Sequence, residues 1–517
     1  MKNKKFFLAL LLVVFFTALG ITWKGAINSG KWAGALNFDS VRAAVLNEIS
    51  IPIVFNGELI ETIFGVEMYD MTVKGGLQQM NAAGITWIRH NDLRSDLPTD
   101  ALIWAAVENS KGARNWNEMS GLETQLKNAV EFDKKVILIV RSTPKWASLN
   151  DQSPCGPIKP SEYAAFADFM YDAVKRYSDP KYNVKYWELY NEPDYPLNTN
   201  NPPFGEPHGC WGNANDPYNN GEAYGDMLNV VYPKIKEADP EAKVLIGGLL
   251  LDCDPRPNQP DNKSLCELKK PTYTSQPNFL EGILLSGAGN SFDGVSFHAY
   301  DYFPYWPPWS GSFGVFLNEG WGTNWNTTGP VVIKKTEFIK EVLTKYSITG
   351  KELYNTESAL LHTSSIYENS GICDDPVDTN YENTKASHIV QTYALAKALG
   401  LKANIYFHAK GWRCSALIDH GNQPIQPGYD SYSFTSEKLR YSTFENEILS
   451  YGPNVKAYEF QNDGSGRKLW VIWSLDGANY PITLPSKPSK IWYFDGTPQS
   501  FSGTSFTVKL EPHFIEY

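Results

Sequence analysis

The sequence predicts an α/β protein, a (β/α)8 TIM barrel followed by a small C-terminal antiparallel β-domain. The first observation behind this prediction is a succession of short, nearly all-apolar runs separated by longer segments of helical period. The second is a change near Gly452 to alternating apolar and polar residues, which is the pattern of half-buried strands. The chain has 517 residues, 42% of them hydrophobic, so it can bury a large core.

Eight apolar runs are predicted to form a parallel sheet that is buried on both faces. They cover residues 63–67, 86–90, 135–140, 185–190, 243–248, 294–298, 351–355 and 403–407. With the helical segments between them, they match the eight strand-helix units of a barrel. A doubly wound open sheet is the structural alternative. No G-x-G-x-x-G follows the first strand, so dinucleotide binding is not indicated.

Amphipathic helices are predicted between these strands. The segment 160–177 places six apolar side chains on one stripe, namely Tyr163, Phe166, Met170, Ala173, Val174 and Tyr177. The segment 221–240 does the same with Tyr224, Met227, Leu228, Val231 and Ile235. A further helix is expected to stop at Gly400, because glycine favours the left-handed conformation that ends a helix.

The loops that leave the predicted strands are long and rich in aromatic residues, Pro and Gly, over 194–221, 252–278, 299–330 and 358–386. In a barrel these loops gather at one face, where active sites lie. All six cysteines would fall there, and an even number in an exported chain favours disulfides. Nearest-neighbour pairing gives Cys155–Cys210, Cys253–Cys266 and Cys373–Cys414. Free buried thiols are the alternative.

The ends of the chain set the expected domain boundaries. Residues 1–20 combine lysines, an apolar run and small residues, as in a secretory signal peptide; the alternative is an uncleaved anchor reaching about residue 23. The barrel is predicted over 45–451. Residues 452–517 are predicted to form a β-sandwich-like domain that packs on the barrel or recruits a strand at 50–56.

The expected location is secreted or extracellular, with a tether if the N-terminal run is an anchor. No other run is long and apolar enough to suggest a second span. The formal net charge is −11 and no basic stripe is present, so nucleic acid is not an expected partner.

Two glutamates follow or lie on predicted barrel strands. Glu192, in "YNEPD", comes directly after strand four, and Pro193 ends strand pairing there because it has no N–H to donate. Glu357, in "YNTES", lies at the corresponding end of strand seven. Strands four and seven face each other across a closed barrel, so the two carboxyl groups can flank one bond. Glycoside hydrolysis needs that arrangement: a separation of about 5–5.5 Å predicts retention and about 9 Å predicts inversion.

These residues resemble the retaining glycoside hydrolases of clan A, whose catalytic glutamates lie on strands four and seven of a (β/α)8 barrel. "WELYNEPD" is similar to the Asn-Glu-Pro signature of strand four, and "YNTES" stands on the nucleophile strand. "WIRH" on strand two and "SFHAY" on strand six also match the clan. The run 224–248 and "STPKWAS" after strand three resemble family 39 and its relatives. The likeness spans roughly residues 60 to 450.

The resemblance implies a role for each matching residue. Glu192 would be the general acid and then the general base, and Glu357 the nucleophile of a double-displacement reaction. Five further residues would bind the sugar or support the site. Asn191 would bind the hydroxyl next to the anomeric carbon, and Trp412 would stack on a sugar ring. Arg89 and Tyr300 would hold Glu357 ionised, and His298 would support the site.

Structural alternatives stay open for the supporting residues. Arg89 pairs with Glu67 in one alternative, while His298 and Trp412 are core residues in another. Glu188, inside strand four, is read as a buried structural carboxylate. The expected substrate is a poly- or oligosaccharide. The rival functions are a transglycosylase with the same glutamates and a non-catalytic carbohydrate-binding protein.

No cofactor or metal is expected, because the histidines are scattered and H-E-x-x-H is absent. The acidic segment 374–382 is either a solvated loop, which is favoured, or a calcium loop. A serine hydrolase is not indicated, since no G-x-S-x-G surrounds "SFHAYDYF".

Overall fold

The computed structural model describes most of the chain beyond its N-terminal segment. The described residues are 54–55, 58–59, 62–90, 101–149, 156–195, 211–213, 215–257, 263–268, 278–304, 312–364, 379–462 and 466–517. They belong to one compact unit, Pro52–Tyr517. The predicted signal peptide or anchor lies outside the described residues. No helix in the described part is long and apolar enough to cross a membrane.

Parallel strands close into a barrel, which confirms the predicted fold class. The barrel strands are β3 (Phe64–Glu67), β4 (Trp87–His90), β6 (Lys135–Arg141), β7 (Tyr186–Asn191), β8 (Lys243–Leu249), β9 (Gly294–Phe303), β12 (Glu352–His362) and β13 (Ala403–Tyr406). They pair in the order β3-β4-β6-β7-β8-β9-β12-β13, and β13 pairs back to β3. Each coincides with a predicted run, because strands buried on both faces leave an apolar signal that is hard to mistake.

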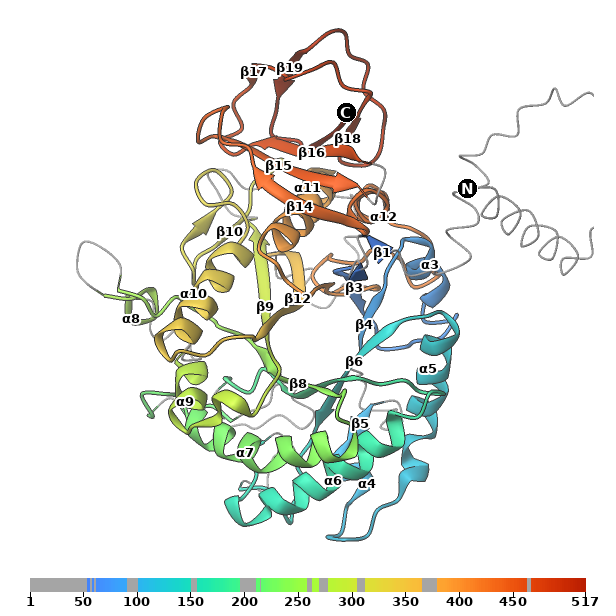
Figure 1. The fold of residues 1–517 in the computed structure, drawn as a ribbon, viewed down its shortest axis with the longest axis vertical. Coiled ribbons are helices and arrows are strands. Elements are labelled where there is room, and N and C mark those ends of the chain that lie inside the picture. The colour runs from blue at the N-terminus through green and yellow to red at the C-terminus, as the bar shows by residue number, and fades with distance from the viewer. Residues whose placement is uncertain are drawn as a thin grey trace, which may run out of the picture. The chain divides into compact units, whose positions relative to one another are not determined.

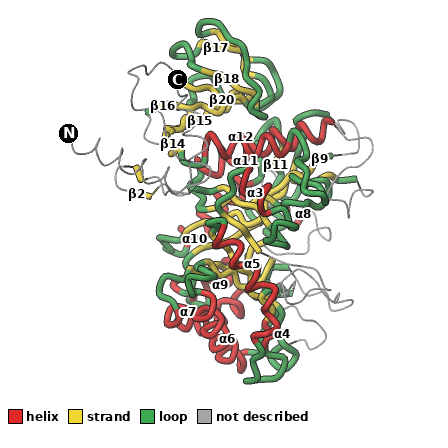
Figure 2. The backbone as a smooth tube through the Cα atoms, turned by 90° about the vertical axis from the view of Figure 1, so that its right-hand side faces the viewer, coloured by secondary structure: helices red, strands yellow, loops and turns green. Residues whose placement is uncertain are grey.

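Helices surround these strands (Figure 1). The α-helices are α3 (Leu77–Ala82), α4 (Trp104–Val107), α5 (Ser120–Glu131), α6 (Tyr163–Tyr177), α7 (Gly221–Ala238), α8 (Leu265–Leu268), α9 (Phe279–Leu285), α10 (Val332–Lys345), α11 (Thr379–Ala398) and α12 (Gly428–Leu439). In the described residues, three short 3-10 helices are η2 (Trp116–Met119), η3 (Pro160–Glu162) and η4 (Ala288–Asn290). Figure 2 shows the barrel strands inside and the helices outside them.

The apolar stripes predicted for two helices face the core. Every residue of the predicted stripe on α6 is buried, and so is every one on α7. Inside the barrel, a separate cluster fills the lumen, made of Trp87, Ile137, Leu245, Tyr354, Ala403 and Ile405. The lumen is therefore packed with side chains, and a site can form only at the strand ends.

Two barrel strands are longer than predicted. β9 continues to Phe303 and β12 to His362, and their extensions pair with each other beyond the barrel. The loops expected over 299–330 and 358–386 are accordingly shorter, because β9 and β12 occupy their first residues and α11 begins at Thr379. Residues 379–382 are therefore helical, and the rest of the acidic segment 374–382 lies outside the described residues.

Several short strands pair with the barrel strands or with one another. β5 (Leu102–Ile103) pairs with β6, while β10 (Leu317–Asn318) and β11 (Thr323–Asn324) extend the sheet from β9. β1 (Val54–Phe55) and β2 (Glu58–Leu59) form their own antiparallel pair. The described part of the segment 50–56 therefore pairs with β2.

The C-terminal region forms an antiparallel sheet, as predicted. Its order is β14 (Ser442–Glu447), β15 (Val455–Asn462), β16 (Arg467–Ser474), β20 (His513–Glu516) and β18 (Lys490–Tyr493). A second sheet pairs β17 (Tyr480–Thr483) with β19 (Ser505–Val508). The first sheet takes in β14, which precedes residue 452, and the boundary at 452 remains a prediction.

The alternation of side chains in this sheet explains how it packs on both faces. Ala457 and Ile472 join a small core with Phe506 and Val508 of the second sheet. Side chains of the opposite face join the barrel core, and the ring of Phe434 on α12 lies 5.1 Å from that of Phe514. The sheet therefore packs on the barrel, one of the two arrangements expected from the sequence.

One predicted disulfide is present between described residues. Cys253 and Cys266 are bonded, with their Cα atoms 5.2 Å apart. Cys414 is also disulfide-bonded. Its predicted partner, Cys373, lies outside the described residues, and so does the predicted pair Cys155–Cys210. The bond at Cys253 ties the loop after β8 to α8.

Candidate active site

Glu192 follows the last residue of β7 in a left-handed backbone conformation, with φ of 45°. Its N–H donates to the carbonyl of Gly248 at 2.9 Å, so the residue is still tied to the neighbouring strand β8. Pro193 then carries the chain away without an N–H to pair. The side chain is 6% exposed. A strand that ends on Asn-Glu-Pro thus holds its glutamate at the carboxyl end of the barrel.

Glu357 lies within β12 next to an irregularity in register. The pairing of β12 with β9 shifts between Asn355 and Glu357, and beyond this shift Glu357 lies opposite His298. The Glu357 carboxylate accepts hydrogen bonds from Arg89 Nη1 and from the Tyr300 hydroxyl. With 5% of its surface exposed, the side chain is fixed by these two donors.

His298 bridges the two glutamates. Its Nδ1 atom lies 2.8 Å from Oε1 of Glu192 and 3.4 Å from Oε2 of Glu357. One oxygen of each carboxyl group and a nitrogen of the imidazole lie within 4.8 Å of one another. The two carboxyl groups are therefore neighbours at the carboxyl end of the barrel, and the retaining outcome expected from their separation remains a prediction.

Arg89 organises the negative charge beneath the site. This fully buried guanidinium contacts Glu67 Oε2 at 2.5 Å and Glu188 Oε1 at 2.5 Å, in addition to Glu357. Its Nη2 also donates to the amide oxygen of Asn191 at 2.5 Å. Both alternatives raised for Arg89 thus hold at once, since it pairs with Glu67 and also with Glu357. Glu188 is buried against it, as expected for a structural carboxylate.

The pKa values of Glu67 and Glu357 depend on their burial and on the guanidinium of Arg89, which contacts both carboxyl groups. Burial raises the pKa of Glu357 to about 7; Arg89 opposes this rise and Glu192 adds to it. Burial, with Glu357 as the next cause, raises the pKa of Glu67 well above its ordinary value. Arg89 opposes this rise only in part, because its charge is shared among Glu67, Glu188 and Glu357.

The two ring side chains beside Glu357 are held uncharged. Burial lowers the pKa of His298, although the contact with Glu192 opposes the shift, so the imidazole is neutral near pH 7. Burial and the charge of Glu357 raise the pKa of Tyr300, so its hydroxyl remains a hydrogen-bond donor. The charged groups beside these two rings are therefore the glutamates and Arg89.

Trp412 stands apart from the other sequence-predicted site residues. Glu192, Glu357, Asn191, Arg89, His298 and Tyr300 form one connected group of contacts. Trp412 is half-buried, and its ring packs edge-on against Phe407, which in turn contacts Tyr300. Its role as a stacking platform stays a prediction.

Two buried charged residues near the site left no sequence signal that identified them. Asp194 accepts from the N–H groups of Leu250 and Leu251 at 2.9 Å, and burial raises its pKa to about 6. Lys335 reaches in from α10, and its ammonium donates to the carbonyls of His298 and Leu250 at 2.7 and 2.8 Å. Lys335 belongs to no motif identified in the sequence, and Asp194 lies outside the Asn-Glu-Pro signature.

Glu192, His298 and Glu357 are also the group of described residues whose ligand atoms are close enough to share a metal ion. Those atoms already contact one another, and Glu357 is held by Arg89 and Tyr300. The guanidinium charge beside Glu357 disfavours a second cation there. The arrangement therefore suits acid-base and nucleophilic chemistry better than metal binding.

Several solved structures with the same fold are glycoside hydrolases. A family 39 glycoside hydrolase from the gut symbiont Bacteroides cellulosilyticus WH2 shares 17% identity, with a TM-score of 0.58 over 87% of this chain and 80% of that one. A family 30 subfamily 8 xylanase from Clostridium acetobutylicum shares 13%, with a TM-score of 0.53 over 88% and 97%. A family 51 α-L-arabinofuranosidase from Bifidobacterium longum also shares 13%, with a TM-score of 0.53 over 89% and 97%.

These likenesses confirm the fold expected from the resemblance to clan A. No family model matches the sequence, and no curated protein matches it either. At identities this low, what the chain does has to be argued from its own residues.

Proposed function

We propose that the protein is a retaining glycoside hydrolase that cleaves O-glycosidic bonds in poly- or oligosaccharides. The observation that carries the proposal is the meeting of two buried carboxyl groups, Glu192 and Glu357, whose oxygens lie within 4.8 Å at the carboxyl end of the barrel. The fold shared with glycoside hydrolases of three families supports it.

In the first step, Glu192 donates its proton to the glycosidic oxygen while a carboxylate oxygen of Glu357 attacks the anomeric carbon. The bond from that carbon to the leaving oxygen breaks, and a covalent glycosyl-enzyme forms. The neutral imidazole of His298 can accept a hydrogen bond from the protonated Glu192, which favours the acid form before the step. Arg89 and Tyr300 direct their donors at Glu357 and favour its ionised form.

In the second step, water replaces Glu357 at the anomeric carbon. Once Glu357 has become a neutral ester, its charge no longer discourages ionisation of Glu192. Glu192 then removes a proton from the water as it attacks, and the product leaves with the original anomeric configuration. One residue thereby serves as acid and then as base.

Asn191 is proposed to bind the sugar hydroxyl next to the anomeric carbon. Its amide oxygen accepts from Arg89, so the amide orientation is fixed by the same cation that holds Glu357. Trp412 is proposed as a sugar-stacking ring, because it is half-buried beside Phe407 near Tyr300. The substrate class proposed is a plant or microbial polysaccharide, or oligosaccharides released from one.

The protein is further proposed to act outside the cell. The lysines and apolar run at the N-terminus support export. The disulfide between Cys253 and Cys266 is typical of an oxidising compartment.

The proposal is tested by incubating the full chain with nitrophenyl glycosides and with xylan, arabinan and β-glucan, and by following the product configuration by NMR. Hydrolysis that yields the retained anomer first is the expected result. Products that appear first with inverted configuration would contradict the double displacement. Binding of these sugars without any cleavage would instead favour the non-catalytic alternative.

A further inference from the structure

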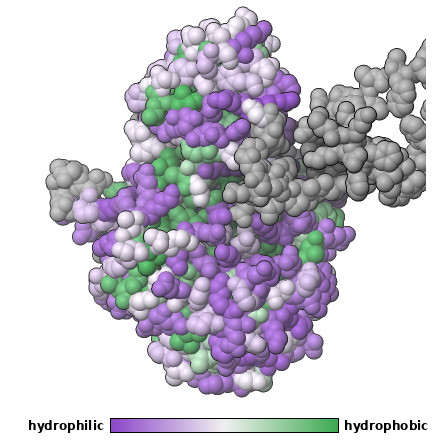
Figure 3. Space-filling view, viewed as in Figure 1, coloured by the Kyte–Doolittle hydropathy of each residue, from purple (hydrophilic) through white to green (hydrophobic). Residues whose placement is uncertain are grey.

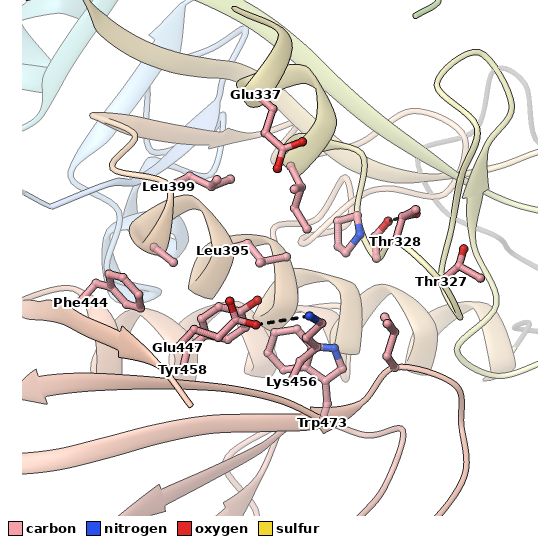
Figure 4. Close-up of a pocket in the computed structure, with 15 residues that line it drawn as sticks. Thr327, Thr328, Glu337, Leu395, Leu399, Phe444, Glu447, Lys456, Tyr458 and Trp473 are labelled. Atoms are coloured by element: carbon pink, nitrogen blue, oxygen red, sulfur yellow. Dashed lines mark hydrogen bonds and ion pairs between the residues drawn. The ribbon is translucent and has the colours of Figure 1, made fainter. Parts of the chain in front are cut away.

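A second pocket lies between the C-terminal sheet and the outer helices of the barrel. It has a volume of about 480 Å³, which is within the ~300–1,000 Å³ range of small-molecule sites. One wall comes from α10 and α11, and the other comes from β14, β15 and β16 (Figure 4). In a space-filling view, hydrophobic surface is visible in the recess below the C-terminal sheet (Figure 3).

The sheet wall of this pocket follows from strand register. Lys456 pairs with Trp473 across β15 and β16, and Tyr458 pairs with Glu447 across β15 and β14. Paired residues and those two positions apart share a face, so these four side chains all point toward the helices. The rings of Tyr458 and Trp473 lie stacked on each other with their centroids 5.4 Å apart and are almost fully buried, so they support the floor of the pocket. The half-buried ring of Phe444 and aliphatic side chains also line this floor.

The opening of the pocket is polar. Glu447 and Lys456 form an ion pair of 3.3 Å in which both side chains are about one-third exposed. Glu337 on α10 is exposed and lies across the pocket from this pair, and Thr327 also lines the pocket (Figure 4). The pocket thus combines an apolar floor, aliphatic side chains from α11, and both hydrogen-bond donors and acceptors at its rim.

We propose that this pocket is a second carbohydrate-binding site, which holds a neutral saccharide unit of the polymer whose cleavage is proposed above. A sugar ring presents C–H groups to the half-buried ring of Phe444 and the aliphatic side chains of the floor, and hydroxyl groups to the polar rim. The carboxylates of Glu337 and Glu447 accept hydrogen bonds from hydroxyl groups, and the ammonium of Lys456 donates one. The identity of the polymer rests on the proposed function, whereas the location of the site rests on the pocket.

The rim charges select against charged ligands. Two carboxylates face one ammonium there, so an anionic sugar such as a uronic acid would meet net repulsion. A purely apolar ligand would leave the Glu447–Lys456 pair desolvated and without new partners, which is unfavourable. A neutral saccharide avoids both penalties.

The test uses the full chain carrying Glu357→Gln, so that sugars bind without being cleaved. Xylohexaose, arabinohexaose and cellohexaose are titrated by calorimetry, and migration is followed in gels that contain soluble arabinoxylan. Two sites per chain are expected for at least one sugar. Adding Glu337→Ala or Lys456→Met should weaken one of the two sites at least about tenfold, because each change removes polar contacts to hydroxyl groups.

Lys468→Met is the matched control. Lys468 lies on β16 of the same sheet and is paired with Glu459 at 3.0 Å, but its register partner Gln461 places it on the opposite face. Both sites should survive this change. Circular dichroism and thermal unfolding of each variant establish that it is folded.

Each outcome either supports the second site or overturns it. A single site in the Glu357→Gln chain, or a second site that neither rim variant weakens, overturns the inference even if the unaltered chain hydrolyses sugar. Binding at two sites in a chain that never cleaves any substrate would instead leave the second site standing and remove the proposed hydrolase activity.

Discussion

The imidazole of His298 lies directly against the backbone of Gly248, so that a β-carbon at position 248 would come within 2.2 Å of Nε2 of His298. No real side chain tolerates such an approach without movement. Gly248 is therefore the residue that allows His298 to stand between Glu192 and Glu357. The carbonyl of the same glycine also accepts the N–H of Glu192.

Gly248→Ala is expected to lower kcat by about 10²-fold with a small change in KM. The added methyl group displaces the imidazole, and a displacement of about 1 Å in catalytic geometry costs about that factor. Steady-state kinetics with an aryl glycoside measures it. Gly421→Ala is the control, because the nearest atom there is 3.3 Å from the new β-carbon and can turn aside. Equal kinetics for Gly248→Ala and the unaltered chain would remove His298 from the proposed role.

Glu357→Ala should reduce hydrolysis by about 10³-fold or more, because no nucleophile remains to form the covalent intermediate. Azide should restore part of the rate by entering the space left by the carboxylate. The product should then be a glycosyl azide of inverted configuration, which NMR identifies. Turnover that is unchanged by the substitution would exclude Glu357 as the nucleophile.

Glu192→Ala should affect substrates according to their leaving groups. A dinitrophenyl glycoside needs little protonation of the departing oxygen, so its first step should remain fast while its second step slows. A substrate with a poor leaving group should lose about 10²–10⁴-fold, which is the usual contribution of general acid catalysis. Pre-steady-state kinetics distinguishes the two steps. Equal losses for both substrates would argue against Glu192 as the acid.

The activity should fall as the pH drops through about 7, because burial raises the pKa of Glu357 to about 7 and protonation removes the nucleophile. The acidic limb of the kcat/KM profile measures this. In Arg89→Lys a single ammonium replaces the guanidinium nitrogens that contact Glu67, Glu188 and Glu357, so the ionised form of Glu357 is less stabilised and the limb should move to higher pH. A limb that stays in place would assign the titration to another group.

The same pKa makes a prediction about stability. The folded-state pKa of Glu357, about 7, lies above the ordinary value of 4.5, so the folded chain binds this proton more tightly than the unfolded chain. The resulting stabilisation is complete below the ordinary value and is lost as the pH rises through about 7.

Relative to Glu357→Gln, the unaltered chain should therefore lose roughly 1–3 kcal/mol of unfolding free energy between about pH 5 and about pH 8. Urea unfolding at both pH values measures the difference. Glu437→Gln serves as the control, since that carboxyl on α12 is 66% exposed. A difference that grows in the opposite direction would contradict the raised pKa.

The sequence predicted structural elements correctly where a local pattern of residues was enough to identify them. Barrel strands such as β6 are apolar on both faces, and the stripes of α6 and α7 recur at helical spacing. The Asn-Glu-Pro turn also located Glu192, because the proline ends pairing immediately after the glutamate. Each of these signals lies within a few neighbouring residues.

Other features had no local signal. The length of β12 depends on pairing with the extension of β9, which is a contact between distant segments. In the sequence Lys335 resembles a surface residue of α10. It is buried because its ammonium donates hydrogen bonds to the carbonyls of His298 and Leu250, which come from distant segments. The aromatic-rich segment 299–330 was expected to lie in a loop at the active-site face, yet Trp321 within it is fully buried and donates its indole N–H to the carbonyl of Leu251.

By itself the sequence determined the order of strands and helices, the change to a C-terminal sheet, and the two glutamates worth pairing. These depend on period and on turn chemistry, which short stretches of chain carry. The tertiary structure decided that Arg89 serves Glu67, Glu188 and Glu357 together, and that a pocket opens between α10 and the C-terminal sheet. Both depend on how side chains from distant strands and helices share space, and no local pattern encodes that.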